Sequence, residues 1–233
     1  MPRIYLSPSL QEYNPFYGGG SEEEVMNLIA DAMEPYLAAD GIEYLRNAPE
    51  MTLGQAIADS NNSNVDFHLA IHSNAAPPSV AGTRRGPVVY YYATSPYGRQ
   101  MAELIADEQR EIYPDPSKVQ VLPTTTLREL RRTNAPSALV EVAYHDNPED
   151  AAWIRGNIDE IGKALAMRSL PISVCGKELE NFYVKRKPYI CPQRCMVLFC
   201  TKTERENATS FGKTVNTKFF WKKIKGNSNN GRI

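Results

Sequence analysis

The stretch Asp66-Phe-His-Leu-Ala-Ile-His-Ser-Asn74 predicts a buried strand with two histidines on one of its faces. Side chains alternate along a strand, so one face collects the large apolar residues and the other collects both histidines. The strand runs into a pair of prolines, which indicates a loop. His72 therefore lies at the carboxyl end of a core strand, the edge at which open α/β sheets build their sites. This stretch alone leaves two interpretations of His72, a metal ligand or a satisfied histidine at a strand end.

A second stretch, Ala138-Leu-Val-Glu-Val-Ala-Tyr144, is apolar except for Glu141. A carboxylate within so apolar a run is costly unless it is paired or takes part in chemistry. Glu141 is therefore expected to be either a reactive group or one half of a buried ion pair. The nearby basic residues that would form such a pair are Arg128, Arg131 and Arg132.

Strand-like and helix-like stretches alternate through the first two thirds of the chain. Strands are expected near residues 3–6, 41–45, 66–74, 87–92, 119–122 and 138–144. Helices are expected near residues 21–36, 52–61, 95–113, 127–132, 147–153 and 158–166. This alternation predicts an α/β fold, with a mostly parallel twisted sheet and helices on both faces.

A long irregular loop, residues 7–20, separates the first strand from the first helix, and such loops are often functional. Ser21 is the expected cap of that helix. Glu22 and Glu23 fall in its first turn, where negative charge suits the helix dipole. On this stretch alone the dipole is a sufficient explanation for Glu23.

The charge is divided unevenly along the chain. Residues 1–166 carry 12 basic and 23 acidic residues, a net charge of −11, whereas residues 167–233 carry 14 and 4, a net charge of +10. We therefore expect a first domain at residues 1–168 and a basic C-terminal extension at residues 169–233. The extension holds all four cysteines, in a spacing that does not suit zinc. It is a small β module, a poorly folded extension or a tail translated out of frame.

The beginning of the chain, Met1-Pro-Arg-Ile-Tyr-Leu6, enters a strand directly and lacks the pattern of a secretory signal. No apolar run reaches the length of a membrane span. The sequence predicts synthesis in the cytoplasm, with release by another agent if the protein acts outside the membrane. Nucleic acid is not an expected partner.

Three motifs occur in a fixed order: Glu23 before Met26-Asn-Leu28, then Ala70-Ile-His-Ser-Asn-Ala75, then Ala135-Pro-Ser-Ala-Leu-Val-Glu-Val-Ala-Tyr-His-Asp-Asn147. In this order and at these separations they resemble the zinc-dependent N-acetylmuramoyl-L-alanine amidases of the amidase-3 family. The resemblance covers roughly residues 3–166. Ser7-Pro-Ser-x-Gln11-x-x-Asn14 and Tyr144-His-Asp-Asn147 are similar to a branch found in Gram-positive bacteria and their prophages.

The resemblance implies Glu23 and His72 as two of three zinc ligands, with Glu141 as the catalytic glutamate. The third ligand departs from the family pattern, because the usual Gly-His-Gly-Gly of the first loop is absent. Gln11 occupies that loop but offers only an amide oxygen, a weaker zinc ligand than imidazole. His145 is the chemical alternative, four residues past Glu141 and expected on the same face by alternation. We favour His145 and expect Gln11 to line the same site.

By the same resemblance, the expected reaction is hydrolysis of the amide bond between N-acetylmuramic acid and L-alanine in peptidoglycan. The enzyme would be an endolysin or autolysin acting at the cell wall after release. Gln11, Asn74 and Arg128 are the expected substrate contacts, and Arg128 is otherwise a solvated surface residue. The basic extension would bind anionic wall polymers. The alternatives are a non-catalytic wall-binding or regulatory module that has lost its zinc, and a different metal-dependent amidohydrolase.

Overall fold

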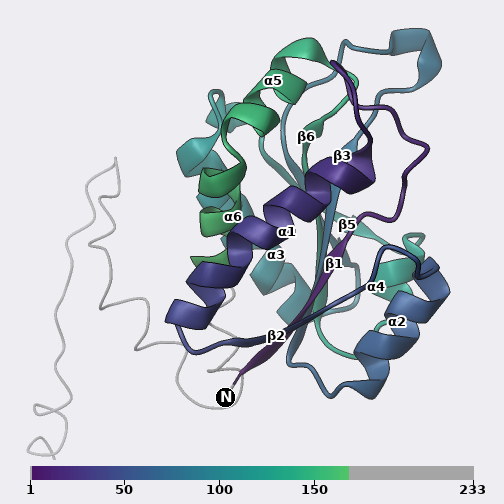
Figure 1. Ribbon diagram of the computed structural model, residues 1–233, viewed down its shortest axis with the longest axis vertical. Helices are drawn as coiled ribbons and strands as arrows, with labels where there is room; N and C mark the ends of the chain where they lie inside the picture. The colour runs from purple at the N-terminus through teal and green to yellow at the C-terminus, as the bar shows by residue number, and fades with distance from the viewer. Residues whose placement is uncertain (1, 168–233) are drawn as a thin grey trace, which may run out of the picture. The chain divides into compact units, whose positions relative to one another are not determined.

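A six-stranded twisted sheet lies at the centre of the computed structural model, which describes residues 2–167 (Figure 1). The strands are β1 (Arg3–Pro8), β2 (Glu43–Arg46), β3 (Phe67–Asn74), β4 (Val88–Tyr92), β5 (Gln120–Thr124) and β6 (Ser137–Tyr144). Their order across the sheet is β2-β1-β3-β6-β4-β5. Neighbouring strands are parallel except β6 and β4, which are antiparallel. The predicted mostly parallel α/β sheet is confirmed.

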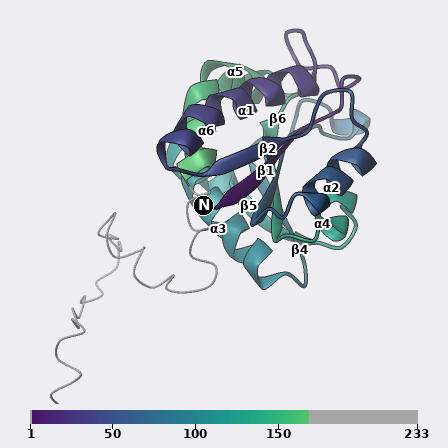
Figure 2. The same cartoon turned by 60° about the horizontal axis from the view of Figure 1, so that its bottom comes forward.

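The helices cover both faces of the sheet, as predicted. They are α1 (Glu22–Ala39), α2 (Leu53–Asn62), α3 (Pro96–Ile112), α4 (Arg128–Arg132), α5 (Pro148–Gly156) and α6 (Ile158–Met167). Figure 2 shows α1, α3, α5 and α6 on one side of the sheet and α2 with α4 on the other. Short 3₁₀ turns occur at Pro78–Val80 and Pro116–Lys118.

Capping side chains define where the helices begin. The Ser21 hydroxyl accepts a hydrogen bond from the Glu24 backbone N–H at the start of α1. Thr52 and Gln55 form a reciprocal capping box at the start of α2. These caps satisfy backbone N–H groups that have no partner within the helix. Since both helices follow strands of the parallel part of the sheet, both begin at the carboxyl edge of those strands.

Alternation along β3 and β6 sorts their side chains between the two faces. Leu69, Ile71 and Val140 belong to the large core formed with α1, α3 and α6. Ala70 and Leu139 face the other way and pack with Leu130 of α4 in a small second core. His68, His72 and Glu141 share the parity of this second set, so they lie on the face that α2 and α4 cover only in part.

Predictions about the C-terminal extension and its cysteines lie outside the described residues. Within residues 2–167, no helix is long and apolar enough to cross a membrane.

We expect residues 1–168 to fold without the extension, because the described core is closed by α6. Ile161 and Leu165 of α6 are fully buried, and Gly162 lies so close to Ala32 of α1 that an added Cβ would be 2.6 Å from the Ala32 Cβ. A chain ending at residue 168 should unfold cooperatively in urea, and one ending at residue 157, which lacks α6, should not. A 1–168 chain without a cooperative transition would contradict this boundary.

Candidate active site

The site is built at the carboxyl ends of β1, β3 and β6. His72 of β3 and Glu141 of β6 are register partners on adjacent parallel strands, so both side chains leave the sheet on the same face, roughly one strand spacing apart. The His72 side chain keeps 15% of its surface exposed, and Glu141 is partly buried. The structure therefore brings together the two residues that the sequence singles out most strongly.

Glu22, the first residue of α1, contacts His72 directly. Its Oε1 lies 3.0 Å from His72 Nδ1 and also accepts a hydrogen bond from the Ser73 backbone N–H. Its Oε2 accepts a hydrogen bond from Asn14 Nδ2 at 2.8 Å, and its side chain is 1% exposed. Hydrogen bonds therefore fix both oxygens of this carboxylate. Glu22 is thus held in place either to pair with His72 or to bind a metal ion beside it.

The structure places Glu22, rather than the expected Glu23, in contact with His72. The Glu22 backbone N–H donates to the Asn14 carbonyl oxygen, which turns the Glu22 side chain inward as the helix leaves its cap. Glu23 is then directed about 100° away around the helix. It is only partly buried, and burial together with the charges of Glu12 and Glu50 raises its pKa.

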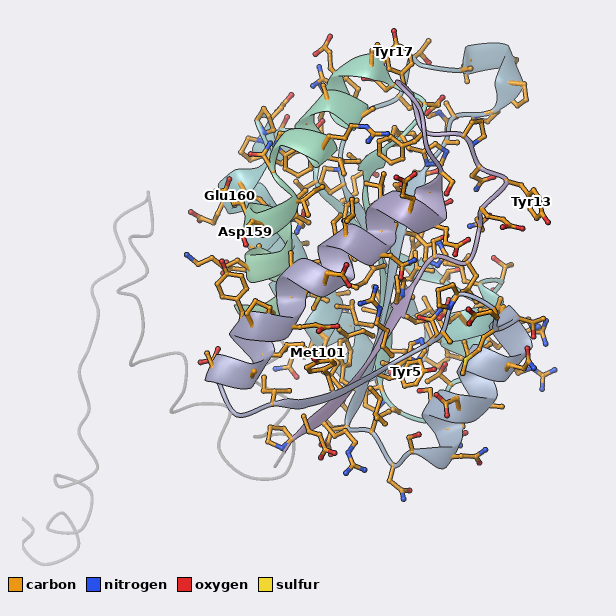
Figure 3. The ribbon with its side chains drawn as sticks, viewed as in Figure 1. Tyr5, Tyr13, Tyr17, Met101, Asp159 and Glu160 are labelled. Carbon is orange, nitrogen blue, oxygen red and sulfur yellow. The ribbon has the colours of Figure 1, made fainter. Side chains whose placement is uncertain are left out.

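Gln11 joins the cluster from the loop between β1 and α1. Its Nε2 lies 3.4 Å from His72 Nδ1, and its Oε1 accepts a hydrogen bond from Asn14. Three successive glycines with positive φ, Gly18 to Gly20, let this loop reverse, whereas Tyr13 at its tip is exposed (Figure 3). The loop therefore supplies both Gln11 and Asn14 to the surroundings of His72.

His145 does not join this cluster, contrary to expectation. Its Nδ1 lies 3.0 Å from Ser73 Oγ and 2.9 Å from the Ser73 carbonyl oxygen, and its ring packs against Phe16. The register between β3 and β6 shifts just past His72, so β6 contains one residue more than β3 over this interval. The irregularity reverses the alternation that the sequence argument assumed and places His145 with Ser73, on the opposite face from His72.

The expected substrate contacts are dispersed. Asn74 lies at the end of β3, and its carbonyl oxygen accepts a hydrogen bond from the His145 N–H. Arg128 is exposed at the start of α4, beside Gly54 of α2 rather than beside His72. Of the three, only Gln11 contacts the histidine.

Glu129 of α4 is a site residue that sequence reasoning missed. Its Oε1 lies 2.9 Å from His68 Nε2 and accepts a hydrogen bond from Ser7 Oγ at 2.5 Å. Its Oε2 lies 3.7 Å from His72 Nε2, an ion-pair distance. The only sequence signal is that Glu129 is the single acidic residue in a short basic stretch, and this signal does not say which way the side chain points.

His68, two residues before Ala70 on the same face of β3, holds the Glu129 carboxylate in place. Its Nδ1 lies 2.9 Å from Ser60 Oγ of α2, and its ring stacks on Tyr5 at 5.3 Å between centroids. Figure 3 shows Tyr5 in the interior, where its hydroxyl donates to Asp59 of α2. The fully buried His68 is thus a structural residue that ties Glu129 to β3.

The carboxylates around His72 raise its pKa, and a zinc ion at Nδ1 would take the place of the proton that they stabilise there. Burial acts to lower the pKa of His72, but the carboxylates of Glu129 and Glu22 raise it to about 10. Burial acts to raise the pKa of Glu129, but hydrogen bonding to His68 and His72 holds it well below its usual range. The pKa of Glu22 is lowered in the same way, by His72, Asn14 and Ser73 against the effect of burial.

Glu141 has a different environment. Burial raises its pKa to about 7, against the opposing effect of the His72 charge. Its Oε2 is buried and has no hydrogen-bond partner. No ion pair joins Glu141 to an arginine within residues 2–167, so the alternative of a structural ion pair is not supported there. An unpartnered carboxylate with a pKa near neutrality is suited to accepting and releasing a proton.

His72 and two side chains beside it have atoms that suit zinc, and one of these three, the Gln11 amide, is a weak neutral donor. Within the described part of the chain, no three His, Cys, Asp or Glu side chains are arranged to hold a metal, so a third donor must be of another type. Glu22 Oε1 and the Gln11 amide lie 3.0 and 3.4 Å from His72 Nδ1. Two atoms bound tetrahedrally to one zinc ion are about 3.3 Å apart. Rotation of the Gln11 amide would present its oxygen in place of its nitrogen.

The comparison with family models gives one match. The amidase-3 model, described as N-acetylmuramoyl-L-alanine amidase, matches residues 11–167. This span contains the residues of the cluster except Ser7, which lies in β1. A comparison with curated protein sequences finds no match.

Several solved structures are similar to this chain. The N-acetylmuramoyl-L-alanine amidase AmiC2 of Nostoc punctiforme is 20% identical, with a TM-score of 0.64 over 72% of this chain and 95% of that chain. An N-acetylmuramoyl-L-alanine amidase from Clostridium difficile 630 is 17% identical, with a TM-score of 0.66 over 75% and 96%. The catalytic domain of an endolysin targeting Clostridia Difficile is 17% identical, with a TM-score of 0.60 over 73% and 97%. At these identities the likeness shows a shared fold.

The substitution Glu129→Ala should destabilise the protein strongly, because it leaves His68, His72 and Ser7 without their shared acceptor. Removing one partner of a buried ion pair costs about 3–5 kcal/mol. Urea unfolding measures the loss, and Glu103→Ala is the matched control, since Glu103 forms an exposed ion pair with Arg99. Equal effects of the two substitutions would contradict the role given to Glu129.

Proposed function

The chain belongs to the amidase-3 family of N-acetylmuramoyl-L-alanine amidases and hydrolyses the amide bond between N-acetylmuramic acid and L-alanine in peptidoglycan; we propose that Glu141, His72 and Glu22 carry out this hydrolysis with zinc. The observation that carries the assignment is the meeting of these three side chains at one edge of the sheet. Glu22 contacts His72, and Glu141 is the register partner of His72 on the adjacent strand.

Zinc is proposed as the cofactor, held by His72, Glu22 and the amide of Gln11. When bound, it would polarise the scissile carbonyl and lower the pKa of a bound water. His72 and Glu22 supply the imidazole and carboxylate that zinc favours, whereas Gln11 supplies a neutral donor. The hydrogen bond from Asn14 to Glu22 Oε2 orients this carboxylate beside His72.

Glu141 is proposed as the general base and then the general acid. Its unpartnered Oε2 is the atom that would accept a proton from the attacking water and deliver it to the departing alanine nitrogen. A pKa near 7 allows the carboxylate to hold and release that proton at comparable cost. The apolar neighbours in β6 keep the group from being hydrated and produce the raised pKa.

Glu129 is proposed to position His72. Its Oε2 faces His72 Nε2, while Glu22 and Gln11 face Nδ1. A carboxylate on the far nitrogen fixes the orientation of an imidazole whose near nitrogen binds a metal. The site therefore uses both nitrogens of one ring, one toward the proposed zinc and the other toward α4.

The proposed setting is the cell wall, reached after synthesis in the cytoplasm, in an endolysin or autolysin role. One of the solved structures of the same fold is an endolysin catalytic domain. Binding of anionic wall polymers by the basic extension stays a prediction. The non-catalytic module gains no support, and the family match favours an amidase over other amidohydrolases.

The substitution Glu141→Gln should abolish lysis without loss of fold, since glutamine is nearly isosteric but cannot accept the proton. Loss of a general base lowers rates by about 10²–10⁴-fold. Mass analysis of peptides released from purified peptidoglycan gives the rate and shows whether the new amino terminus is alanine. A rate within a few-fold of the unsubstituted protein would remove Glu141 from this role.

Adjacent glutamates provide a matched test of the metal site. Glu22→Gln should weaken zinc binding at least about tenfold, because it removes a charged donor from the His72 cluster. Glu23→Gln, the same change one position along α1, should leave zinc binding unchanged. Competition with a fluorescent zinc chelator measures both. A larger loss of zinc affinity from Glu23→Gln than from Glu22→Gln would indicate Glu23 as the ligand and overturn the assignment of Glu22.

A further inference from the structure

A cavity of about 580 Å³ lies between α2 and α4, outside the cluster around His72. Arg128, Arg131 and Arg132 line it from α4, and Gly54, Ile57 and Asn61 line it from α2. We call it the α2–α4 groove. Its volume is within the range of small-ligand sites, and no acidic residue lines it.

The three arginines have no ion pair within residues 2–167. Three guanidinium groups on one short helix repel one another unless an anion lies between them. The only carboxylate of α4, Glu129, is turned away toward His68. The groove therefore offers concentrated positive charge that the described residues do not neutralise.

Both ends of the groove are held by specific contacts. Asn61 Nδ2 donates to the Arg132 carbonyl oxygen, and Asn61 Oδ1 accepts from the Asn134 N–H. Near the other end, a Cβ added to Gly54 would lie 3.3 Å from Arg128 Nη2, so glycine leaves the space that the guanidinium occupies. With Glu129 fixing the start of α4, the helix that carries the arginines is held in place, which lowers the entropic cost of ordering its backbone on binding.

The groove begins close to the catalytic residues. Arg128 directly precedes Glu129, whose carboxylate lies 3.7 Å from His72, so the Arg128 backbone is within roughly 13 Å of the His72 ring. A peptide of four residues in extended form spans about 13 Å. A stem peptide whose first amide lies at Glu141 and His72 can therefore reach the arginines.

We propose that the α2–α4 groove binds the free carboxylates of the stem peptide of the substrate. The proposal rests on the proposed function, since the scissile amide must lie at Glu141. Arginine pairs with carboxylates through two parallel hydrogen bonds, which gives orientation as well as attraction. The groove thus holds the leaving peptide, while His72 and Glu141 act on its first amide.

The test is calorimetric titration of the full-length protein with the synthetic tetrapeptide L-Ala-γ-D-Glu-L-Lys-D-Ala, which contains no scissile bond. The same peptide with both carboxylates amidated is the ligand control. We expect the acid form to bind at least about tenfold more tightly than the amidated form. Arg128→Gln should remove most of this preference, and Arg99→Gln, the same change on α3, should retain it.

Equal binding of the two peptides, or equal losses from Arg128→Gln and Arg99→Gln, would overturn the proposal. Inorganic phosphate that binds more tightly than the acid peptide would also overturn it, and would indicate a phosphate-rich polymer instead. Digestion of peptidoglycan without binding of the peptide would refute the proposed role of the groove and leave the proposed function intact. Binding of the peptide without digestion of peptidoglycan would refute the proposed function and support peptide binding by the groove.

Discussion

The interaction on which the site depends is the placement of His72 between two buried carboxylates. Glu22 approaches from α1, and Glu129 approaches from α4 on the other face of the sheet. Charged groups at such exposures, 1% and 5% for the two carboxylates, are tolerated only when they are paired and hydrogen-bonded. His68, Ser7, Asn14 and the Ser73 backbone complete the pairing. The first loop, both helices and two strands, β1 and β3, are thereby fixed around one imidazole.

The same arrangement explains how a five-residue helix is kept in place. A helix as short as α4 is not stable by itself in water. Leu130 packs on Ala70 and Leu139, Glu129 is bonded to His68, and Asn61 holds the residues that follow. Because α4 also carries the three arginines, the residues that hold His72 and those that line the α2–α4 groove are mechanically one unit. Glu129 therefore links the proposed substrate groove to the placement of His72.

Sequence periodicity predicts the sheet and the two central residues well, because β3 and β6 are apolar strands whose faces follow from alternation. Register then brings His72 and Glu141 together without any further assumption. Prediction from sequence periodicity fails where a shift of one residue changes which side chains face the site. Glu22 rather than Glu23 turns inward because the helix starts from its cap at that angle, and the register shift past His72 sends His145 to the other face. The sequence does not reveal the role of Glu129, because that role comes from non-local packing between α4 and β3.

Anomalous diffraction at the zinc absorption edge, on crystals of the zinc-loaded protein, tests the central claim most directly. The account predicts a single peak at the carboxyl edge of β3, bonded to His72 Nδ1, Glu22 and Gln11, with Glu129 on His72 Nε2 and Glu141 facing the ion. A peak bonded to His145 or Glu23, or a zinc ion bound to His72 through Nε2 with Glu129 displaced, would contradict it.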